Sequence, residues 1–355
     1  KILCSHAYCI SFERYQQLNS IIKDDPRFNL GFDRYNKNVD ETNEYANANF
    51  LAVEKLGEEL PLTRDDRNFL YSRINQHSDS QASHAIMIYA LEELAGPHQS
   101  EWMLAAEQAK IIIGFAMTEL GCGTEASKVK TTAHYNPHSD EIILNSNSLE
   151  SLKWWAGLGP RTTHMILWAQ FHIAGKNEGV LPFLVQIRDL TTLEILPGIM
   201  IGYIGPKAGV ELAQYFYLGF SNFRMPTSSL LQRFVSIRDG QLHLHHPEAK
   251  SLIIGTLADM RCQLISWSWR PAALALTISI RYSEVRRQFP TLEEPGQERT
   301  VMDYQMQQLK LVPALAQSIA QLFGGRAILN WFEDYKASAL KGDFSMLQEI
   351  QATSA

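Results

Sequence analysis

Residues 116–124 read AMTELGCGT and combine hydroxyl side chains with glycines in a way that suits a flat, polar ligand. Thr118 and Thr124 each offer one hydrogen-bond donor and two acceptor lone pairs. Gly121 and Gly123 leave the backbone open to close approach. A ligand rich in ring carbonyls and nitrogens, such as an isoalloxazine ring, would match this lining. Taken alone, the stretch also fits an ordinary glycine-rich turn whose threonines cap neighbouring backbone groups.

A second candidate is the stretch KWWAGLG, residues 153–159. Adjacent side chains in a strand point to opposite faces, so one of Trp154 and Trp155 can enter a core while the other lines a cleft. Gly157 and Gly159 again leave the backbone accessible. A core tryptophan followed by a turn would produce the same pattern.

A third candidate joins RYSEVRRQF, residues 281–289, to DYQMQQ, residues 303–308. On a helix, Arg286 would share a face with the tyrosine four residues earlier. An arginine in that place could bind a diphosphate through two N–H groups. Gln305, with a second glutamine three residues later, could present amides to a ring or a ribose. A solvated helical face with long arginine side chains is the alternative.

The elements that must position these motifs change in character along the chain. From about residue 10 to 110 the pattern is helical, although the Asn-rich NKNVDETNEYANANF fits either a polar link or an exposed helix. From about 111 to 235, short β-rich runs are spaced too closely for crossover helices, which predicts antiparallel pairing. From about 249 long helical patterns return, and Pro271 should kink or divide a helix. The predicted order is therefore α, β, α.

Composition excludes several classes of protein. The 355 residues are 45% hydrophobic and 20% charged, which is ordinary for a folded chain with a sizeable core. A net charge of −6 gives no reason to expect nucleic acid as a partner, and no run reaches the ~20 apolar residues that span a bilayer. Four scattered cysteines indicate a reducing compartment. Cys4, His6 and Cys9 lack a second ligand pair, so no metal site is predicted.

The order and spacing of the three motifs, with IGPKAG at 204–209 between the second and the third, resemble the acyl-CoA oxidases. These enzymes are the FAD-dependent, peroxisomal branch of the acyl-CoA dehydrogenase superfamily. The resemblance covers nearly the whole chain, and it implies an α+β, acyl-CoA dehydrogenase-like fold. The expected parts are an N-terminal helical domain at 1–110, a middle antiparallel β-barrel or β-sandwich domain that binds flavin at 111–240, and an incomplete C-terminal helical bundle at 241–355, truncated before the family's second helical domain.

The resemblance also implies site residues. Thr118 matches the threonine that hydrogen-bonds the flavin ring, and Gly157 matches a glycine whose backbone contacts FAD. Arg286 matches the arginine that reaches the FAD diphosphate from the neighbouring subunit of a homodimer. The rest of the implied cofactor-binding set is Gly123, Thr124, Trp155, Gln288, Phe289 and Gln305, of which the last three border the cofactor across the subunit interface.

The implied reaction is the oxidation of a fatty acyl-CoA to a trans-2-enoyl-CoA in the peroxisome. A carboxylate removes the α-proton while the β-hydride passes to the flavin, and O₂ then takes the electrons to give H₂O₂. The family's catalytic glutamate lies in a segment beyond Ala355, so no catalytic residue is assigned in this chain. By the family pattern, Glu119 is a neighbour of the site and not the base.

Two other functions remain open at this stage. A catalytically silent, structural or assembly subunit is favoured by the absence of the base segment. It is also favoured by Gln214, Tyr215 and Phe216, which replace the family's Asp-Asn-Gly turn and should narrow or reshape the acyl pocket. An acyl-CoA dehydrogenase that passes its electrons to a flavoprotein is the third possibility.

Overall fold

The computed structural model describes residues 5, 7–28, 38–74, 79–157, 159, 161–205, 207–208, 215–290, 295–339 and 341–354. The chain forms two compact units, Tyr8–Thr256 and Leu257–Ala355, the second of which includes Lys1–Ala7. Their boundary falls within helix α7 (Ala249–Trp267). The three-domain division at residues 110 and 240 stays a prediction.

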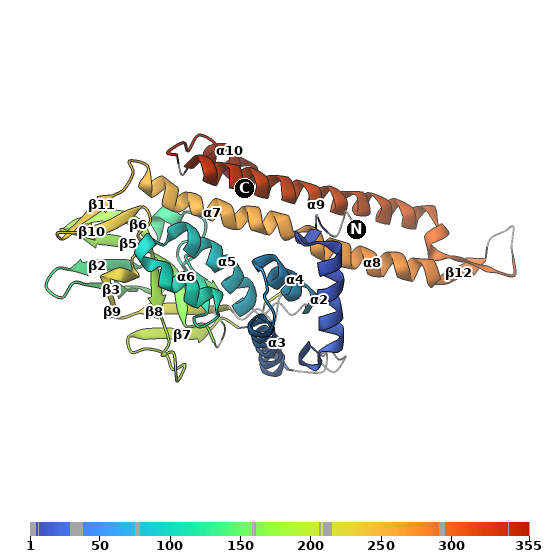
Figure 1. Ribbon diagram of the computed structural model, residues 1–355, viewed down its shortest axis with the longest axis horizontal. Helices are drawn as coiled ribbons and strands as arrows, with labels where there is room; N and C mark the ends of the chain where they lie inside the picture. The colour runs from blue at the N-terminus through green and yellow to red at the C-terminus, as the bar shows by residue number, and fades with distance from the viewer. Residues whose placement is uncertain are drawn as a thin grey trace. The chain divides into compact units, whose positions relative to one another are not determined.

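The larger unit begins with helices, as the sequence predicts. They are α2 (Phe12–Asp24), α3 (Val39–Glu59), α4 (Arg64–Ile74), α5 (Asp79–Leu94) and α6 (Ser100–Glu107) (Figure 1). The Asn-rich stretch is helical, because α3 covers most of it. A capping box starts this helix: Glu41 N–H donates to the Asn38 side chain and Asn38 N–H donates to the Glu41 carboxylate, each at 2.9 Å.

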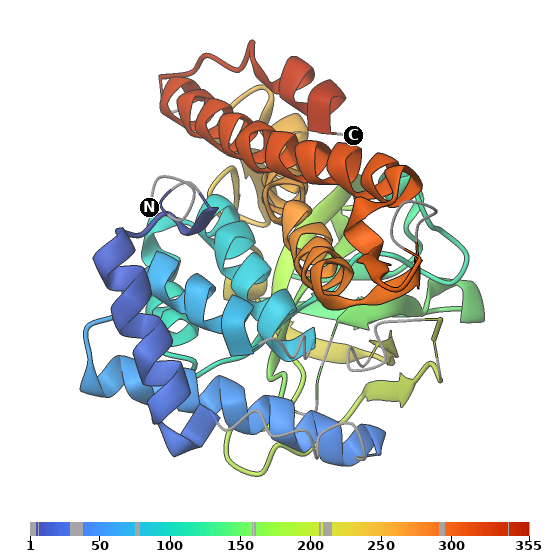
Figure 2. The ribbon, with the colours of Figure 1, turned by 90° about the vertical axis from the view of Figure 1, so that its right-hand side faces the viewer.

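A nine-stranded sheet follows, in the order β7-β8-β4-β1-β5-β2-β3-β9, with β6 paired to β5. Its strands are β1 (Ile113–Ala116), β2 (Thr132–Asn136), β3 (Glu141–Asn145), β4 (Lys153–Gly157), β5 (His164–Ile173), β6 (Lys176–Gln186), β7 (Ile199–Tyr203), β8 (Tyr215–Phe220) and β9 (Phe223–Pro226). A separate hairpin joins β10 (Val235–Arg238) to β11 (Gln241–Leu244). Helix α5 packs against β1 beside this sheet (Figure 2).

The prediction of antiparallel pairing is wrong at two places in the sheet. Strand β5 runs parallel to β1 and to β2, with Ile113 opposite His164 and Thr132 opposite Gln170. The other pairings in this sheet are antiparallel. Close spacing did not exclude parallel neighbours, because the chain returns to β5 through intervening strands of the same sheet and not through a crossover helix.

His84 ties the helices of the larger unit to β1. Its Nδ1 accepts a hydrogen bond from Ile113 N–H at 3.1 Å, so Nε2 carries the proton and donates to the Ala106 carbonyl at 3.0 Å. A second proton would place an N–H group against the N–H of Ile113. Burial accordingly lowers the pKa of His84 from 6.5 to about 4.

We expect this histidine to make the fold sensitive to acid. Between pH 6.5 and about pH 4, His84 is protonated in the unfolded chain and stays neutral in the folded chain. The contribution of neutral His84 to the free energy of unfolding is therefore complete above pH 6.5. It falls by roughly 3 kcal/mol as the pH drops from 6.5 to about 4. Urea unfolding of wild type and His84→Gln at pH 7 and pH 5 would measure this. Wild type should lose more stability on acidification; parallel losses would contradict the assignment.

The smaller unit is a long helical hairpin. Helices α8 (Trp269–Val285) and α9 (Gln305–Ala339) pack side by side, and α10 (Leu347–Ser354) contacts α9. Strands β12 (Arg287–Pro290) and β13 (Glu298–Thr300) pair between α8 and α9. Pro271 behaves as predicted, since α7 ends at Trp267 and the proline lies in the first turn of α8.

The predicted helix through Arg286–Phe289 is wrong. Helix α8 ends at Val285, and Arg286 is extended with φ −73° and ψ 125°. The next residues gain strand partners instead, with Arg287 opposite Thr300 and Pro290 opposite Glu298. Pro290 also disfavours a helical conformation for the residue before it.

Candidate functional site

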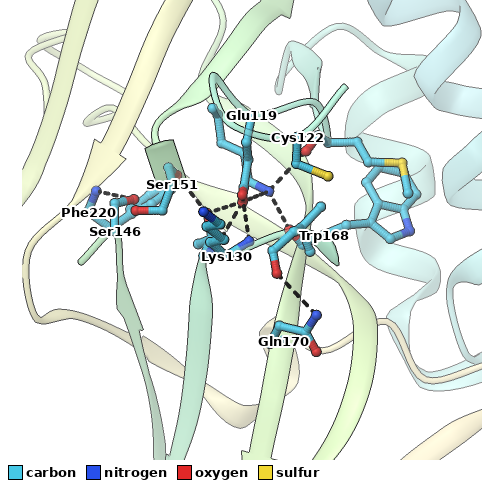
Figure 3. Close-up of polar contacts among 12 residues, drawn as sticks. Glu119, Cys122, Lys130, Ser146, Ser151, Trp168, Gln170 and Phe220 are labelled. Atoms are coloured by element: carbon cyan, nitrogen blue, oxygen red, sulfur yellow. Dashed lines mark hydrogen bonds and ion pairs between the residues drawn. The ribbon is translucent and has the colours of Figure 1, made fainter. Parts of the chain in front are cut away.

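A fully enclosed ion pair lies at the base of the first motif, between the residues that follow β1 and the start of β4. Figure 3 labels its acidic member, Glu119. The Lys153 Nζ donates to Glu119 Oε1 at 2.9 Å, and both side chains are 0% exposed. Lys153 also donates to the Met117 carbonyl at 3.1 Å and to the Trp168 carbonyl at 2.6 Å. The ammonium group has three donors, and each has an acceptor.

The Glu119 carboxylate is equally well satisfied. Its Oε1 accepts hydrogen bonds from Thr131 N–H at 2.9 Å and from Thr131 Oγ1 at 2.6 Å, and its Oε2 accepts from Lys130 N–H. Burial lowers the pKa of Lys153 to about 8, against the opposing attraction of Glu119. The carboxylate cannot reach a substrate from this position. An enclosed carboxylate of this kind is no candidate for the base, and the place of Glu119 beside a flavin site stays a prediction.

The first two motifs lie side by side. Trp154 N–H donates to the Thr118 carbonyl at 2.8 Å, and Leu120 N–H donates to the Leu152 carbonyl at 2.9 Å. Thr118 is half-buried beside this pairing. Gly157 lies in β4 opposite Phe115 of β1, and Phe115 precedes Thr118 by three residues. The structure thus brings together segments that are far apart in the sequence.

The two glycines of the first motif have different surroundings. A Cβ on Gly121 would lie 2.6 Å from Glu150 Cβ and 3.1 Å from the Glu150 carbonyl oxygen, so this glycine allows close packing. A Cβ on Gly123 would meet nothing within 4 Å. Gly123 and the adjacent Thr124 are both exposed. Open backbone for a ligand is therefore found at Gly123.

Trp155 has an unusual conformation for a bulky residue, with φ at +61°. Its side chain is 47% exposed, and its ring meets the Tyr215 ring edge-on at 5.1 Å. Trp154 is half-buried and stacks on Tyr217 at 6.2 Å. The expectation that one tryptophan enters the core is wrong, because the largest side chain enclosed in β4 is that of Lys153. The register of β4 against β8 shifts between Lys153 and Ala156, on either side of the two tryptophans.

The replacement for the family's Asp-Asn-Gly turn is partly visible. Gln214 lies outside the described residues, whereas Tyr215 and Phe216 begin β8. The Lys207 ammonium lies over the rings of Tyr203 and Tyr215, at 5.2 and 5.8 Å from their centres. An aromatic surface with one cation therefore borders Trp155.

The remaining predicted cofactor residues belong to the smaller unit, where α8 gives way to β12 and α9 begins. Arg286, Gln288, Phe289 and Gln305 are all exposed. Tyr304 Oη donates to the Gln288 carbonyl at 2.5 Å, which holds β12 against the start of α9. The structure thus gathers these four residues at one end of the helical hairpin of the smaller unit, whereas Thr118 belongs to the larger unit.

Lys153 is the site residue that the sequence analysis missed. It opens the KWW motif, but sequence alone places a lysine at the surface, because a lysine side chain is almost never fully buried unless it is paired. An available signal was the pairing of one acidic and one basic residue inside two otherwise apolar or small-residue motifs. Among the described residues no group of three or more His, Cys, Asp or Glu could hold a metal ion, and Cys4 and His6 lie outside that part of the chain. No described helix is long and apolar enough to cross a membrane.

Comparison with known proteins gives these contacts a family context. Residues 254–355 match the family model described as "Acyl-CoA oxidase, C-alpha1 domain". Mouse peroxisomal acyl-coenzyme A oxidase 1 is 37% identical over 258 residues, which are 72% of this chain and 39% of the mouse protein. Mouse peroxisomal acyl-coenzyme A oxidase 2 is 33% identical over 346 residues, which are 96% of this chain and 50% of that protein.

Solved structures agree with the sequence matches. Acyl-CoA oxidase 1 of Arabidopsis thaliana superposes with a TM-score of 0.89 at 29% identity, over 97% of this chain and 53% of that one. Acyl-CoA oxidase-1 of Caenorhabditis elegans, solved with FAD and ATP, superposes with a TM-score of 0.91 at 26% identity, over 99% and 53%. The chain spans about half the length of these relatives or less. It belongs to the acyl-CoA oxidase family and has the acyl-CoA dehydrogenase-like fold.

Proposed function

We propose that this chain is the flavin-binding part of an acyl-CoA oxidase, which converts a fatty acyl-CoA and O₂ into a trans-2-enoyl-CoA and H₂O₂. The observation that carries the proposal is the pairing of the Thr118 segment with the strand of Trp155 and Gly157, in a chain of this family. Relatives named as peroxisomal enzymes support a peroxisomal location.

The residues present suit FAD. Open space beside Gly123 lets a flat ring approach the backbone, and Trp155 offers an exposed aromatic surface. Thr118 and Thr124 supply hydroxyl groups, and Arg286 supplies a cation that suits a diphosphate. FAD, when bound, supplies the acceptor for the substrate's hydride. The chain's own part is to bind and orient the ring.

We propose a second copy of the chain as the partner of the smaller unit. Helices α8 and α9 each carry a row of apolar side chains, spaced three to four residues apart, that are more than half exposed. Those on α8 are Leu274, Ile278, Tyr282 and Val285, and those on α9 are Met306, Leu309 and Val312. Exposed apolar rows of this length are typical of an interaction surface. Their position near Arg286 agrees with a cofactor that is shared across a homodimer.

The purified chain tests the proposed function directly. A yellow protein whose flavin absorbance bleaches with fatty acyl-CoA, and which releases H₂O₂ when air is admitted, would support the oxidase. Bleaching that persists in air would identify a dehydrogenase instead. A folded chain that stays colourless and takes up no FAD would overturn both enzymatic functions and favour a silent structural subunit.

Arg286→Ala should reduce FAD retention by about tenfold or more, because a charged hydrogen bond to the diphosphate is lost. The far-UV spectrum should stay helical, since Arg286 lies beyond the end of α8. FAD retained after gel filtration measures the effect. Arg281→Ala is the matched control, because Arg281 is an exposed arginine within α8. Equal retention in the two variants would show that Arg286 is a solvated charge.

A further inference from the structure

The Lys153 ammonium donates hydrogen bonds to the residues on either side of Thr118. One of its hydrogen bonds goes to the carbonyl of Met117, the residue before Thr118, at 3.1 Å. Another goes to the side chain of Glu119, the residue after Thr118, at 2.9 Å. The third, at 2.6 Å to the Trp168 carbonyl, fixes the ammonium to β5. The segment is therefore tied to the middle of the sheet through one side chain.

Glu119 is itself held by hydrogen bonds from a second segment of the chain, Lys130 and Thr131. Its carboxylate is bound by Thr131 and by the backbone of Lys130, and Thr131 Oγ1 also lies 3.0 Å from the Ser151 carbonyl. Backbone hydrogen bonds flank the pair, from Trp154 to Thr118 and from Leu120 to Leu152. The position of Thr118 relative to β4 is thus set by directional contacts at both neighbouring residues.

An enclosed ion pair is a poor device for stability alone. Desolvation of both charges offsets much of their attraction, and apolar side chains of similar volume often stabilise a core equally well. What the pair adds is direction, because each hydrogen bond fixes a distance and an angle. A directional anchor is of use where a neighbouring group must be placed accurately.

We propose that Lys153 and Glu119 are positioning residues that hold Thr118 in place, relative to Gly157, for the flavin ring. This inference rests on the proposed function. Neither side chain touches the ligand, since both are fully enclosed. Their effect on flavin binding is exerted through the backbone of residues 117–119.

A double-mutant cycle on FAD affinity tests the proposal. Lys153→Met and Thr118→Val should each weaken FAD binding by about tenfold, and the double variant should bind no more weakly than the worse single variant, because one effect acts through the other. Flavin fluorescence titration gives the three dissociation constants. Losses that multiply in the double variant would overturn the proposal, since Lys153 would then act independently of Thr118.

Lys130→Met is the matched control. It breaks an exposed lysine–glutamate pair, that of Lys130 with Glu150, next to the same segment and leaves the Lys130 N–H on Glu119. FAD affinity should be unchanged. Glu119→Gln provides a milder route to the same cycle if Lys153→Met does not fold, because the amide oxygen can still accept from Thr131 while its NH₂ group opposes the Lys130 N–H.

Amide hydrogen exchange in the flavin-free chain separates this proposal from the proposed function. In Lys153→Met, the Glu119 and Leu120 amides should exchange at least about tenfold faster relative to those of β3 and β9, and in Lys130→Met they should not. An unchanged ratio in Lys153→Met would overturn the positioning role whether or not FAD binds. A wild-type chain that takes up no FAD but shows the exchange difference would overturn the proposed function and the flavin part of this inference, leaving the anchored backbone established.

Discussion

Lys153→Met is expected to lower the free energy of unfolding by about 3–5 kcal/mol, because it leaves the Glu119 carboxylate buried without its cation. The methionine fills much of the lysine's volume, so lost packing contributes little. Three hydrogen bonds disappear, and the Met117 and Trp168 carbonyls lose a partner inside the core. Urea unfolding followed by circular dichroism measures the change.

Lys130→Met is the control that separates the effect of burial from the effect of losing a positive charge. It removes a lysine from an ion pair of the same kind, but Lys130 and Glu150 are exposed, with side chains 47% and 62% accessible. Such pairs contribute about 1 kcal/mol or less. Similar losses in the two variants would show that the enclosed pair has no special place in the stability of the fold.

Gly114→Ala should be the most damaging single-methyl addition in the site, with a loss of about 3 kcal/mol in the free energy of unfolding. Its Cβ would lie 2.2 Å from the Gly157 carbonyl oxygen and 2.7 Å from Met165 Sδ. The sulfur can move, but the carbonyl belongs to the backbone of β4. Strand β1 must therefore shift away from β4, which also displaces Gly157. We expect this variant to lose FAD as well as stability.

Gly123→Ala is the counterpart of that substitution. Its Cβ would enter open space, and the glycine does not have a positive φ, so stability should stay within about 0.5 kcal/mol of wild type. FAD affinity should nevertheless fall, because the methyl group occupies the surface that the ring is proposed to approach. Unfolding curves and fluorescence titration on both variants would separate packing from ligand contact. A stable Gly114→Ala chain, or a Gly123→Ala chain with unchanged FAD affinity, would contradict these assignments.

Local sequence patterns predicted the elements well and their pairing less well. The α, β, α order and the division at Pro271 are confirmed, because periodicity and proline act over a few residues. The parallel contacts of β5 with β1 and β2 could not be predicted, since strand neighbours depend on the path of the whole sheet. The strand at Arg287–Pro290 was missed for the same reason: its partner, Glu298–Thr300, lies beyond a loop.

The candidate site shows the same division between residue type and surroundings. The sequence identified Gly121 and Gly123 as equivalent openings in the backbone, but only the structure shows Glu150 packed against the first and space beside the second. It also identified the tryptophans of KWW while the enclosed residue is the lysine before them. Chemical type can be read from sequence, whereas burial depends on which distant segments come together.

The enclosed pair of Lys153 and Glu119 also restricts how the protein can change over generations. Loss of either partner strands a charge in the interior, whereas simultaneous replacement of both by apolar residues can be neutral. A lineage that loses the pair by single substitutions must therefore pass through a poorly folded intermediate that keeps only one of the two charges. We expect purifying selection to retain it even in descendants that have given up catalysis.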